Sequence, residues 1–287
     1  MNGMLATSKQ FLLPNLIDSA PSFEALFRIR NAIRGFAGRV EFDLTHTHFV
    51  GPGCVALLGG IARSVQGRGG SVDFNWPSAQ ANVRRHLSTN GFRQALERHP
   101  TEIGTQCIPY REFPAHSSRA MPAIMSYLET EWLERGWVNV SDEQRSHVLG
   151  SMWEIFTNAL EHSGSRSGVI ACGHHQALRG ELQLCVVDLG FGIAANVREY
   201  LENHELPAES ALKWAFVRGN TTSRKGFGRG LGLEILRDFV TIKRGSLEIY
   251  SNDGYALVDR AGVSFQCRNV AAFRGTLVNV RLTCDGF

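Results

Sequence analysis

The residues with the clearest chemical potential lie in one stretch, Trp153 to Ser163. Within it, Glu154, Asn158 and His162 recur at every fourth position, so in a helix all three side chains project from one face. Such a polar stripe could take part in chemistry, but it is more often a solvated face. The sequence that follows is needed to decide between these interpretations.

A second group of residues follows a strand-like run, Leu182 to Val187, which leads directly into Asp188. Gly190, Gly192 and Ile193 come next, and a further glycine-rich stretch runs from Gly226 to Leu233. A carboxylate at the end of a buried strand, followed by two glycine-rich turns, is what an adenine pocket with a phosphate-binding loop requires.

Asp188 could distinguish adenine from guanine. A buried carboxylate accepts a hydrogen bond from the exocyclic amine of adenine, whereas the carbonyl oxygen of guanine would repel it, so the pattern favours ATP over GTP. Gly190 and Gly192 would let the backbone approach the base. The alternative is an Asp that caps a strand-to-loop turn, with the glycines serving the turn alone.

The later glycines, Gly228, Gly230 and Gly232, precede a helical run. Free backbone amides at the start of a helix can hold phosphate oxygens. The spacing resembles a dinucleotide fingerprint, but no strand precedes it, and the sequence has no P-loop motif.

Taken together, these stretches resemble the N, G1 and G2 boxes of the gyrase-type (GHKL) ATPases, which share the Bergerat nucleotide-binding fold with histidine kinases and anti-sigma serine kinases. Arg274-Gly275-Thr276, ahead of the strand-like Leu277 to Leu282, is similar to the family's closing G-T strand. The resemblance covers roughly residues 120 to 284. A histidine kinase is disfavoured, because no dimerisation helix with a phosphoacceptor histidine is evident ahead of the ATP-binding stretch.

The resemblance implies a role for each matching residue. Asn158 would be a magnesium ligand, and Glu154 would act as general base beside the γ-phosphate. A structural salt bridge is the alternative for Glu154, and simple exposure is the alternative for Lys225 and Arg229. The predicted ATP-binding residues are Asn158, His162, Asp188, Gly190, Gly192, Ile193, Lys225, Gly228, Arg229, Gly230, Leu231, Gly232 and Thr276. For His162, which could lie near the phosphates, the alternative is a cap of the helix before Gly164.

The N-terminal part resembles the STAS domain of anti-sigma-factor antagonists. Val40 to Leu44 and Phe49 to Leu58 follow that family's strand, loop and helix. Where the family presents a phosphorylatable Asp-Ser-Ser, this chain has Gly51-Pro52-Gly53, which carries no hydroxyl. A docking module without the usual phosphorylation is therefore the alternative to a phosphorylation switch.

The predicted fold class is α/β with two domains, the second an α/β sandwich whose mixed sheet has helices on one face. Prolines between His99 and Pro122 argue against a long helix and place the domain junction there. The predicted segments are a mobile end over 1–10, a STAS-like domain over 11–100, a linker or edge strand over 101–120, and a histidine kinase-like ATPase domain over 121–287.

Composition limits the partners. The net charge is +3 and the basic residues are scattered, which gives no case for nucleic acid. The six cysteines show no C-x-x-C pairing, which favours a reduced, cytoplasmic protein. No stretch has the length of a membrane span or the pattern of a signal peptide.

The sequence therefore predicts a Mg-ATP-binding regulatory protein with ATPase or protein serine kinase activity, acting through a protein partner. The alternative from another class is a non-catalytic switch in which ATP changes partner binding. The sequence leaves a homo-oligomer open.

Overall fold

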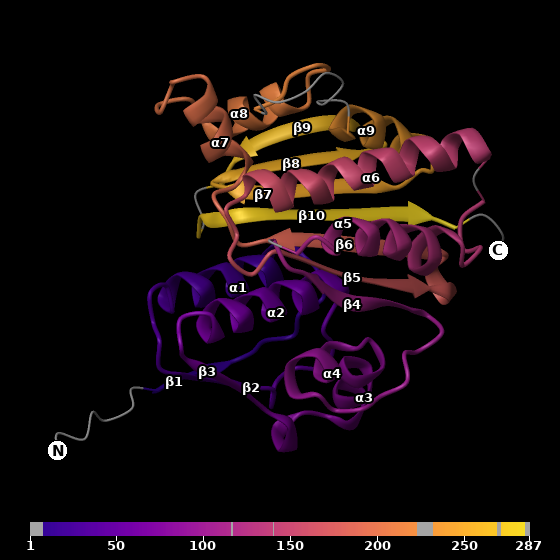
Figure 1. Cartoon of the computed structure of the whole chain (residues 1–287). Coiled ribbons are helices and arrows are strands. Elements are labelled where there is room, and N and C mark those ends of the chain that lie inside the picture. The colour runs from indigo at the N-terminus through magenta and orange to yellow at the C-terminus, as the bar shows by residue number, and fades with distance from the viewer. Residues whose placement is uncertain (1–7, 116, 140, 223–231, 269–270, 285–287) are drawn as a thin grey trace.

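The computed structural model (Figure 1) describes residues 8–115, 117–139, 141–222, 232–268 and 271–284, which form two sheets. A small parallel sheet comes from the start of the chain, and a large antiparallel sheet comes from the remainder. Two helices of the N-terminal part lie between the sheets (Figure 1).

We call residues 8–97 the N-terminal module. Its elements are β1 (Ser8–Leu12), α1 (Ala20–Ala32), β2 (Arg39–Asp43), α2 (Pro52–Gln66), β3 (Ser71–Asn75), α3 (Ala81–Thr89) and α4 (Phe92–Glu97). The three strands are parallel in the order β1-β2-β3, and the crossovers that parallel pairing requires contain α1 and α2. Residues 52–62 of α2 are all buried, because this apolar helix has protein on every side. The STAS-like identity of the module stays a prediction.

The start of the chain differs from the sequence-based expectation. Residues 8–10 were predicted to belong to a mobile end, but they pair with residues 39–41 as the first part of β1. This edge strand is held by backbone pairing, and its side chains are exposed or only partly buried. It therefore lacks the apolar alternation that would have indicated a strand.

The remaining elements build the large sheet and its helices. They are β4 (Cys107–Phe113), α5 (Ala120–Ser126), a π-helical segment (Tyr127–Leu133), α6 (Asp142–His162), β5 (Val169–Gln176), β6 (Glu181–Asp188), α7 (Ile193–Tyr200), α8 (Ala208–Ala215), α9 (Gly232–Ile242), β7 (Ser246–Asn252), β8 (Gly254–Asp259), β9 (Gly262–Cys267) and β10 (Phe273–Thr283). The strand order is β4-β5-β6-β10-β7-β8-β9. β4, in the stretch predicted as a linker or edge strand, forms one edge.

The prediction of a mixed sheet was wrong for the described strands, because every neighbouring pair in this sheet is antiparallel. The connection from β6 to β7 contains helices, as a parallel pair would require. The last strand, β10, enters between β6 and β7 and pairs antiparallel with both. Its place could not be inferred from local periodicity.

Helices cover both faces of the large sheet, not one (Figure 1). α5, α6 and α9 pack on the first face, in a core that includes Leu184 and Val186 of β6. The second face packs against α1 and α2, and the alternating residues Cys185 and Val187 of β6 belong to that core. The N-terminal module thus covers the back of the sheet, away from α6.

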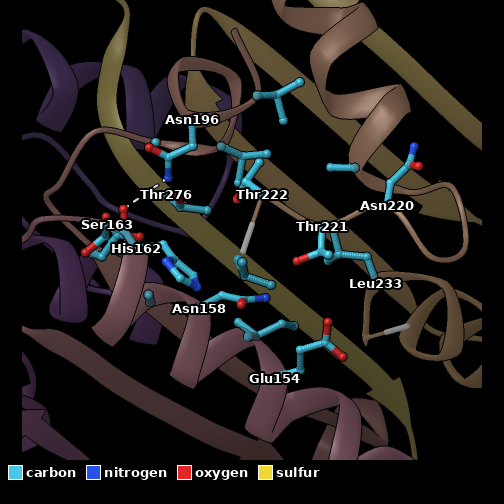
Figure 2. A pocket seen from close by; sticks show the side chains of 18 of the residues that line it. Glu154, Asn158, His162, Ser163, Asn196, Asn220, Thr221, Thr222, Leu233 and Thr276 are labelled. Carbon is cyan, nitrogen blue, oxygen red and sulfur yellow. Dashed lines mark hydrogen bonds between the residues drawn. The ribbon is translucent and has the colours of Figure 1, made fainter. Parts of the chain in front are cut away.

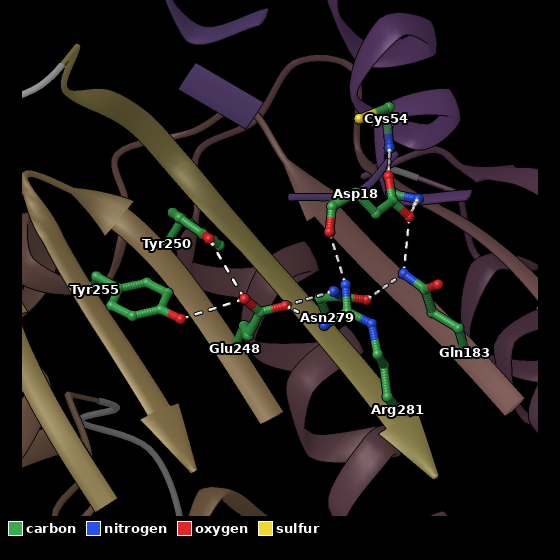
Figure 3. A network of polar contacts seen from close by, with 9 residues as sticks. Asp18, Cys54, Gln183, Glu248, Tyr250, Tyr255, Asn279 and Arg281 are labelled. Atoms are coloured by element: carbon green, nitrogen blue, oxygen red, sulfur yellow. Dashed lines mark hydrogen bonds and ion pairs between the residues drawn. The ribbon is translucent and has the colours of Figure 1, made fainter. Parts of the chain in front are cut away.

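A buried polar network joins the module to the second face (Figure 3). The Asp18 carboxylate accepts hydrogen bonds from the backbone N–H groups of Gly53 and Cys54, both at 2.7 Å, and thereby caps α2. The same carboxylate accepts a 2.8 Å hydrogen bond from Nε2 of Gln183 on β6. Arg281 of β10 donates to the backbone oxygen of Asp18 and to Glu248. Burial raises the pKa of the Asp18 carboxyl, against these donors.

We expect Asp18→Ala to destabilise the protein by about 2–4 kcal/mol, because it leaves buried donors unsatisfied on both sides of the interface. Chemical denaturation of the full chain measures this. The control is Asp73→Ala, which removes an exposed ion pair with Arg39 and should change stability by less than about 1 kcal/mol. Equal losses in the two variants would contradict the assigned role of Asp18.

Candidate functional site

α6 presents the polar stripe predicted from the sequence. The helix begins with a complete capping box, in which the Ser141 hydroxyl accepts from the Gln144 backbone N–H and the Gln144 side chain accepts from Ser141 N–H. Further along the same helix, Glu154, Asn158 and His162 all line one pocket (Figure 2). The opposite face carries buried Met152 and Phe156, which makes the helix amphipathic.

The pocket lies between α6, the strand ends of β6 and β10, and the helices α7, α8 and α9. Its walls combine apolar side chains with polar groups. The lining residues are Glu154, Ile155, Asn158, Ala159, His162, Ser163, Val186, Asp188, Gly192, Ile193, Asn196, Val197, Trp214, Ala215, Asn220, Thr221, Thr222, Leu233, Thr276 and Val278. A largely apolar cleft with a few convergent polar groups is typical of a small-molecule site.

Asp188 is the buried acidic group of the pocket, with 2% of its surface exposed. Its Oδ1 accepts a 2.9 Å hydrogen bond from the backbone N–H of Gly190. Burial raises the pKa of the carboxyl to about 6, although hydrogen bonds from Gly190 and Thr276 and the charge of Arg30 act in the opposite direction. With a pKa of about 6, the carboxyl is mostly ionised at neutral pH although it is buried.

The turn after Asp188 is held tightly. A Cβ on Gly190 would collide with the backbone oxygen of Ser163 at the end of α6, so Gly190 faces that helix while Gly192 lines the pocket. Gly192 has φ 90°, a backbone conformation that favours glycine. The next residue, Ile193, donates its backbone N–H to the Ser251 hydroxyl at 2.7 Å and begins α7.

Thr276 lies directly opposite Asp188 in the β6–β10 register and donates hydrogen bonds to its carboxylate. The preceding residue, Gly275, accepts a 3.0 Å hydrogen bond from the Ser251 hydroxyl. Ser251 thus links the turn after Asp188 to the start of β10. The Arg274-Gly275-Thr276 stretch is therefore part of the same site as Asp188.

His162 also reaches the pocket from the last turn of α6. Its Nε2 atom is buried, makes no hydrogen bond within the described part of the chain, and lies 3.7 Å from the Glu161 carboxylate. The backbone oxygen of His162 accepts a 3.1 Å hydrogen bond from Asn196 of α7. An unsatisfied buried nitrogen facing a pocket is suited to a polar ligand.

Part of the predicted glycine-rich phosphate loop lies outside the described residues, namely Lys225, Gly228, Arg229, Gly230 and Leu231. Gly232 is the first residue of α9, and Leu233 of the same helix lines the pocket. A helix thus begins at the predicted place, and its first turn reaches the pocket.

Several polar residues of the site were not predicted from the sequence. Asn196, Asn220 and Thr222 line the pocket, and Ser251 and Asn252 support its glycine turn from the end of β7. Asn252 accepts from Ala195 N–H and donates to the Phe191 carbonyl. Ser251 and Asn252 lie far along the chain from the glycine motifs, and no local sequence pattern distinguishes the nearer Asn196, Asn220 and Thr222 from ordinary polar residues.

A comparison with known families is consistent with this geometry. Residues 144–280 match the family described as histidine kinase-, DNA gyrase B-, and HSP90-like ATPase, and this range contains all the pocket-lining residues named above. This part of the chain is therefore similar to GHKL-type ATPase domains, and the similarity supports ATP binding. No curated protein is significantly similar to the chain.

Two further findings concern the whole chain. None of the helices in the described ranges is both long and apolar enough to cross a membrane. All six cysteines are free, and five of them are buried.

The raised pKa of Asp188 gives a testable pH dependence of stability. Because the folded state holds this carboxyl at about 6 against an ordinary 3.8, ionisation destabilises the fold increasingly from about pH 4 to 6 and by a constant amount above that. The neutral variant Asp188→Asn avoids this cost. We therefore expect the free energy of unfolding of Asp188→Asn, relative to that of wild type, to increase by about 2 kcal/mol between about pH 4.5 and 7.5.

Denaturant titrations of the apoprotein at the two pH values check this expectation. Asp238→Asn, at an exposed position of α9, is the matched control and should show a much smaller pH dependence. An Asp188→Asn advantage that is the same at both pH values would show that Asp188 has an ordinary pKa.

Proposed function

We propose that the protein is a Mg-ATP-binding regulatory protein with ATPase or protein serine kinase activity, acting through a protein partner. The observation that carries the proposal is the buried Asp188 carboxylate in a pocket that is also lined by Glu154, Asn158 and His162 of α6. The match of residues 144–280 to the ATPase family supports the same conclusion. A cytoplasmic location would fit the free cysteines.

The pocket fits adenine at its Asp188 end. The carboxylate can accept a hydrogen bond from the exocyclic amine of adenine. The Thr276 hydroxyl, which hydrogen-bonds to the same carboxylate, holds it in place for this contact. Apolar Ile155, Val186 and Val278 supply flat contact surface for a base. A guanine in the same place would set its carbonyl oxygen against a buried charge.

The α6 face fits a phosphate-bound magnesium ion. Asn158 is exposed at the pocket and offers a neutral amide oxygen, the kind of hard ligand that magnesium takes together with phosphate oxygens and water. When bound, Mg-ATP supplies a transferable phosphoryl group. Glu154 lies one helical turn from Asn158, where its carboxylate could accept the proton of a water or of a partner's serine hydroxyl.

The non-catalytic switch is the second candidate. α7 and α8 pack on each other and on one end of the large sheet, and both contribute residues to the pocket (Figure 1). A nucleotide that contacts Asn196 and Trp214 would therefore bias the position of these helices. In this alternative, the helices change partner binding without turnover.

The first prediction from this proposed function concerns nucleotide selectivity. In calorimetric titrations with magnesium, we expect ATP to bind far more tightly than GTP, by roughly 10⁴-fold, because guanine leaves the buried carboxylate unpaired. Asp188→Asn should weaken ATP binding by roughly 100-fold or more, since the amide is a poorer acceptor for the adenine amine. Wild-type protein that is folded and binds no ATP would overturn the proposal.

The second prediction separates the enzyme from the switch. We expect Glu154→Gln to bind ATP with an affinity within about threefold of wild type and to lose at least about 100-fold in phosphoryl transfer or hydrolysis. Glu143→Gln, in the first turn of the same helix, should keep full turnover. A wild type that binds ATP but shows no turnover, alone or with its partner, would favour the switch.

A further inference from the structure

α1 of the N-terminal module lies directly behind the ATP site. Phe23, Phe27 and Arg30 occur at spacings of four and three residues, so they share one face of the helix. Phe23 packs edge-on against Tyr250 of β7, with ring centroids 5.2 Å apart, and Phe27 stacks on Phe273 of β10 at 4.4 Å. These contacts fix the third member of the stripe, Arg30, at the end of the sheet where the pocket lies.

Arg30 contacts the turn that follows Asp188, which is the loop proposed to bind adenine. Its guanidinium donates a 3.1 Å hydrogen bond to the backbone oxygen of Leu189, the residue between Asp188 and Gly190, and lies over the Phe273 ring. Burial lowers the pKa of Arg30 to about 10, while the negative charge of Asp188 acts to raise it. The side chain remains a cation at any physiological pH.

The side chain of Leu189 is held by the second helix of the module. A Cβ on Gly60 of α2 would collide with Leu189 Cδ1, so the helix backbone lies against this leucine as closely as a glycine permits. Leu189 is thus held at its carbonyl by α1 and at its side chain by α2. On its other side, the loop is fixed by Gly190 against Ser163 of α6.

We propose that Arg30 is a positioning residue for the ATP site, and that nucleotide binding and docking of the N-terminal module stabilise each other through the Arg30–Leu189 contact. This inference rests on the proposed ATP site. It assigns to the module a direct effect on nucleotide affinity, exerted from the face of the sheet opposite to the pocket.

Two physical effects connect Arg30 to the nucleotide. The hydrogen bond orders the loop that carries Asp188. Without this bond, the loop becomes ordered only when adenine binds, and the entropy cost of that ordering lowers the affinity. The positive charge also favours the ionised form of Asp188, which is the form that accepts the adenine amine. Among the described residues, Glu154 and His162 of α6 line the same pocket as the carboxylate, and the charges of Arg34, Arg68 and Arg274 act on the Arg30 guanidinium.

The reverse effect follows from linkage. If the docked module raises the affinity for ATP by some factor, ATP must strengthen docking of the module by the same factor. A partner protein that pulls α1 from the sheet would then lower ATP affinity, and ATP would oppose such a partner. A partner could thereby change the ATP affinity of the site without contacting the phosphates of the nucleotide.

The test compares Arg30→Met, Arg30→Lys and the control Arg28→Met, which alters an exposed position on the same helix. ATP binding is titrated by calorimetry with magnesium from about pH 5 to 8. For Arg30→Met, we expect the Kd for ATP to rise at least about fivefold at neutral pH. The midpoint of the pH dependence should also move upward by about half a unit, because the charge near Asp188 is lost.

Arg30→Lys separates the two effects. It keeps the charge, so we expect the pH midpoint to return close to the wild-type value while the affinity is only partly restored. A general loss of stability would lower affinity without moving the pH midpoint, and thermal melts of each variant identify that case. Arg28→Met should match wild type in both measurements.

Hydrogen exchange of the intact wild-type chain gives an independent readout. We expect ATP to slow exchange at the amides of α1, although α1 is on the far side of the sheet from the pocket. Unchanged affinity and pH midpoint in Arg30→Met, or α1 exchange that does not respond to bound ATP, would overturn the inference while leaving the ATP site intact. A wild type without ATP binding would instead overturn the proposed function, and this inference with it.

Discussion

The site depends on one costly arrangement, an ionisable carboxyl buried where β6 ends. Asp188 is opposite Val169 of β5 on one side and Thr276 of β10 on the other, and only 2% of its surface is exposed. Burial alone would favour the neutral acid. Donors from Gly190 and Thr276 and the charge of Arg30 act against that tendency, and they keep the group able to ionise near neutral pH.

Two of these compensating groups, Thr276 and Arg30, come from distant parts of the chain, which explains why the site requires the whole architecture. Thr276 reaches Asp188 only because β10 is inserted between β6 and β7. Arg30 reaches the loop only because α1 covers the second face of the sheet. Both faces of β6 are buried, and its residues 182–187 are accordingly buried without interruption. A sheet buried on one face would leave the rear of the turn after Asp188 in water.

The parts of this arrangement that could be predicted from sequence are local ones. The i, i+4, i+8 spacing of Glu154, Asn158 and His162 marked α6, and the apolar run ahead of Asp188 marked β6, because periodicity and strand ends are properties of a few neighbouring residues. The place of β10, the strand β1 and the contact from Arg30 could not be predicted. Each depends on pairing across many residues, and polar strands such as β1 carry no alternation to reveal them.

The segment Gly51-Pro52-Gly53 lies at the contact between the module and the large sheet. It forms the start of α2, and Asp18 caps this helix through the backbone N–H groups of Gly53 and Cys54. A Cβ on Gly51 would collide with the Asp18 carboxylate, so a serine could not replace Gly51 without moving that cap. Asp18 also accepts a hydrogen bond from Gln183 of β6, so a bulky or charged group on residues 51–53 would disturb the interface between the module and the sheet. The coupling that we propose between the module and the Asp188 site therefore uses packing and hydrogen bonds such as Arg30–Leu189, because a phosphate on this loop would displace the Asp18 cap.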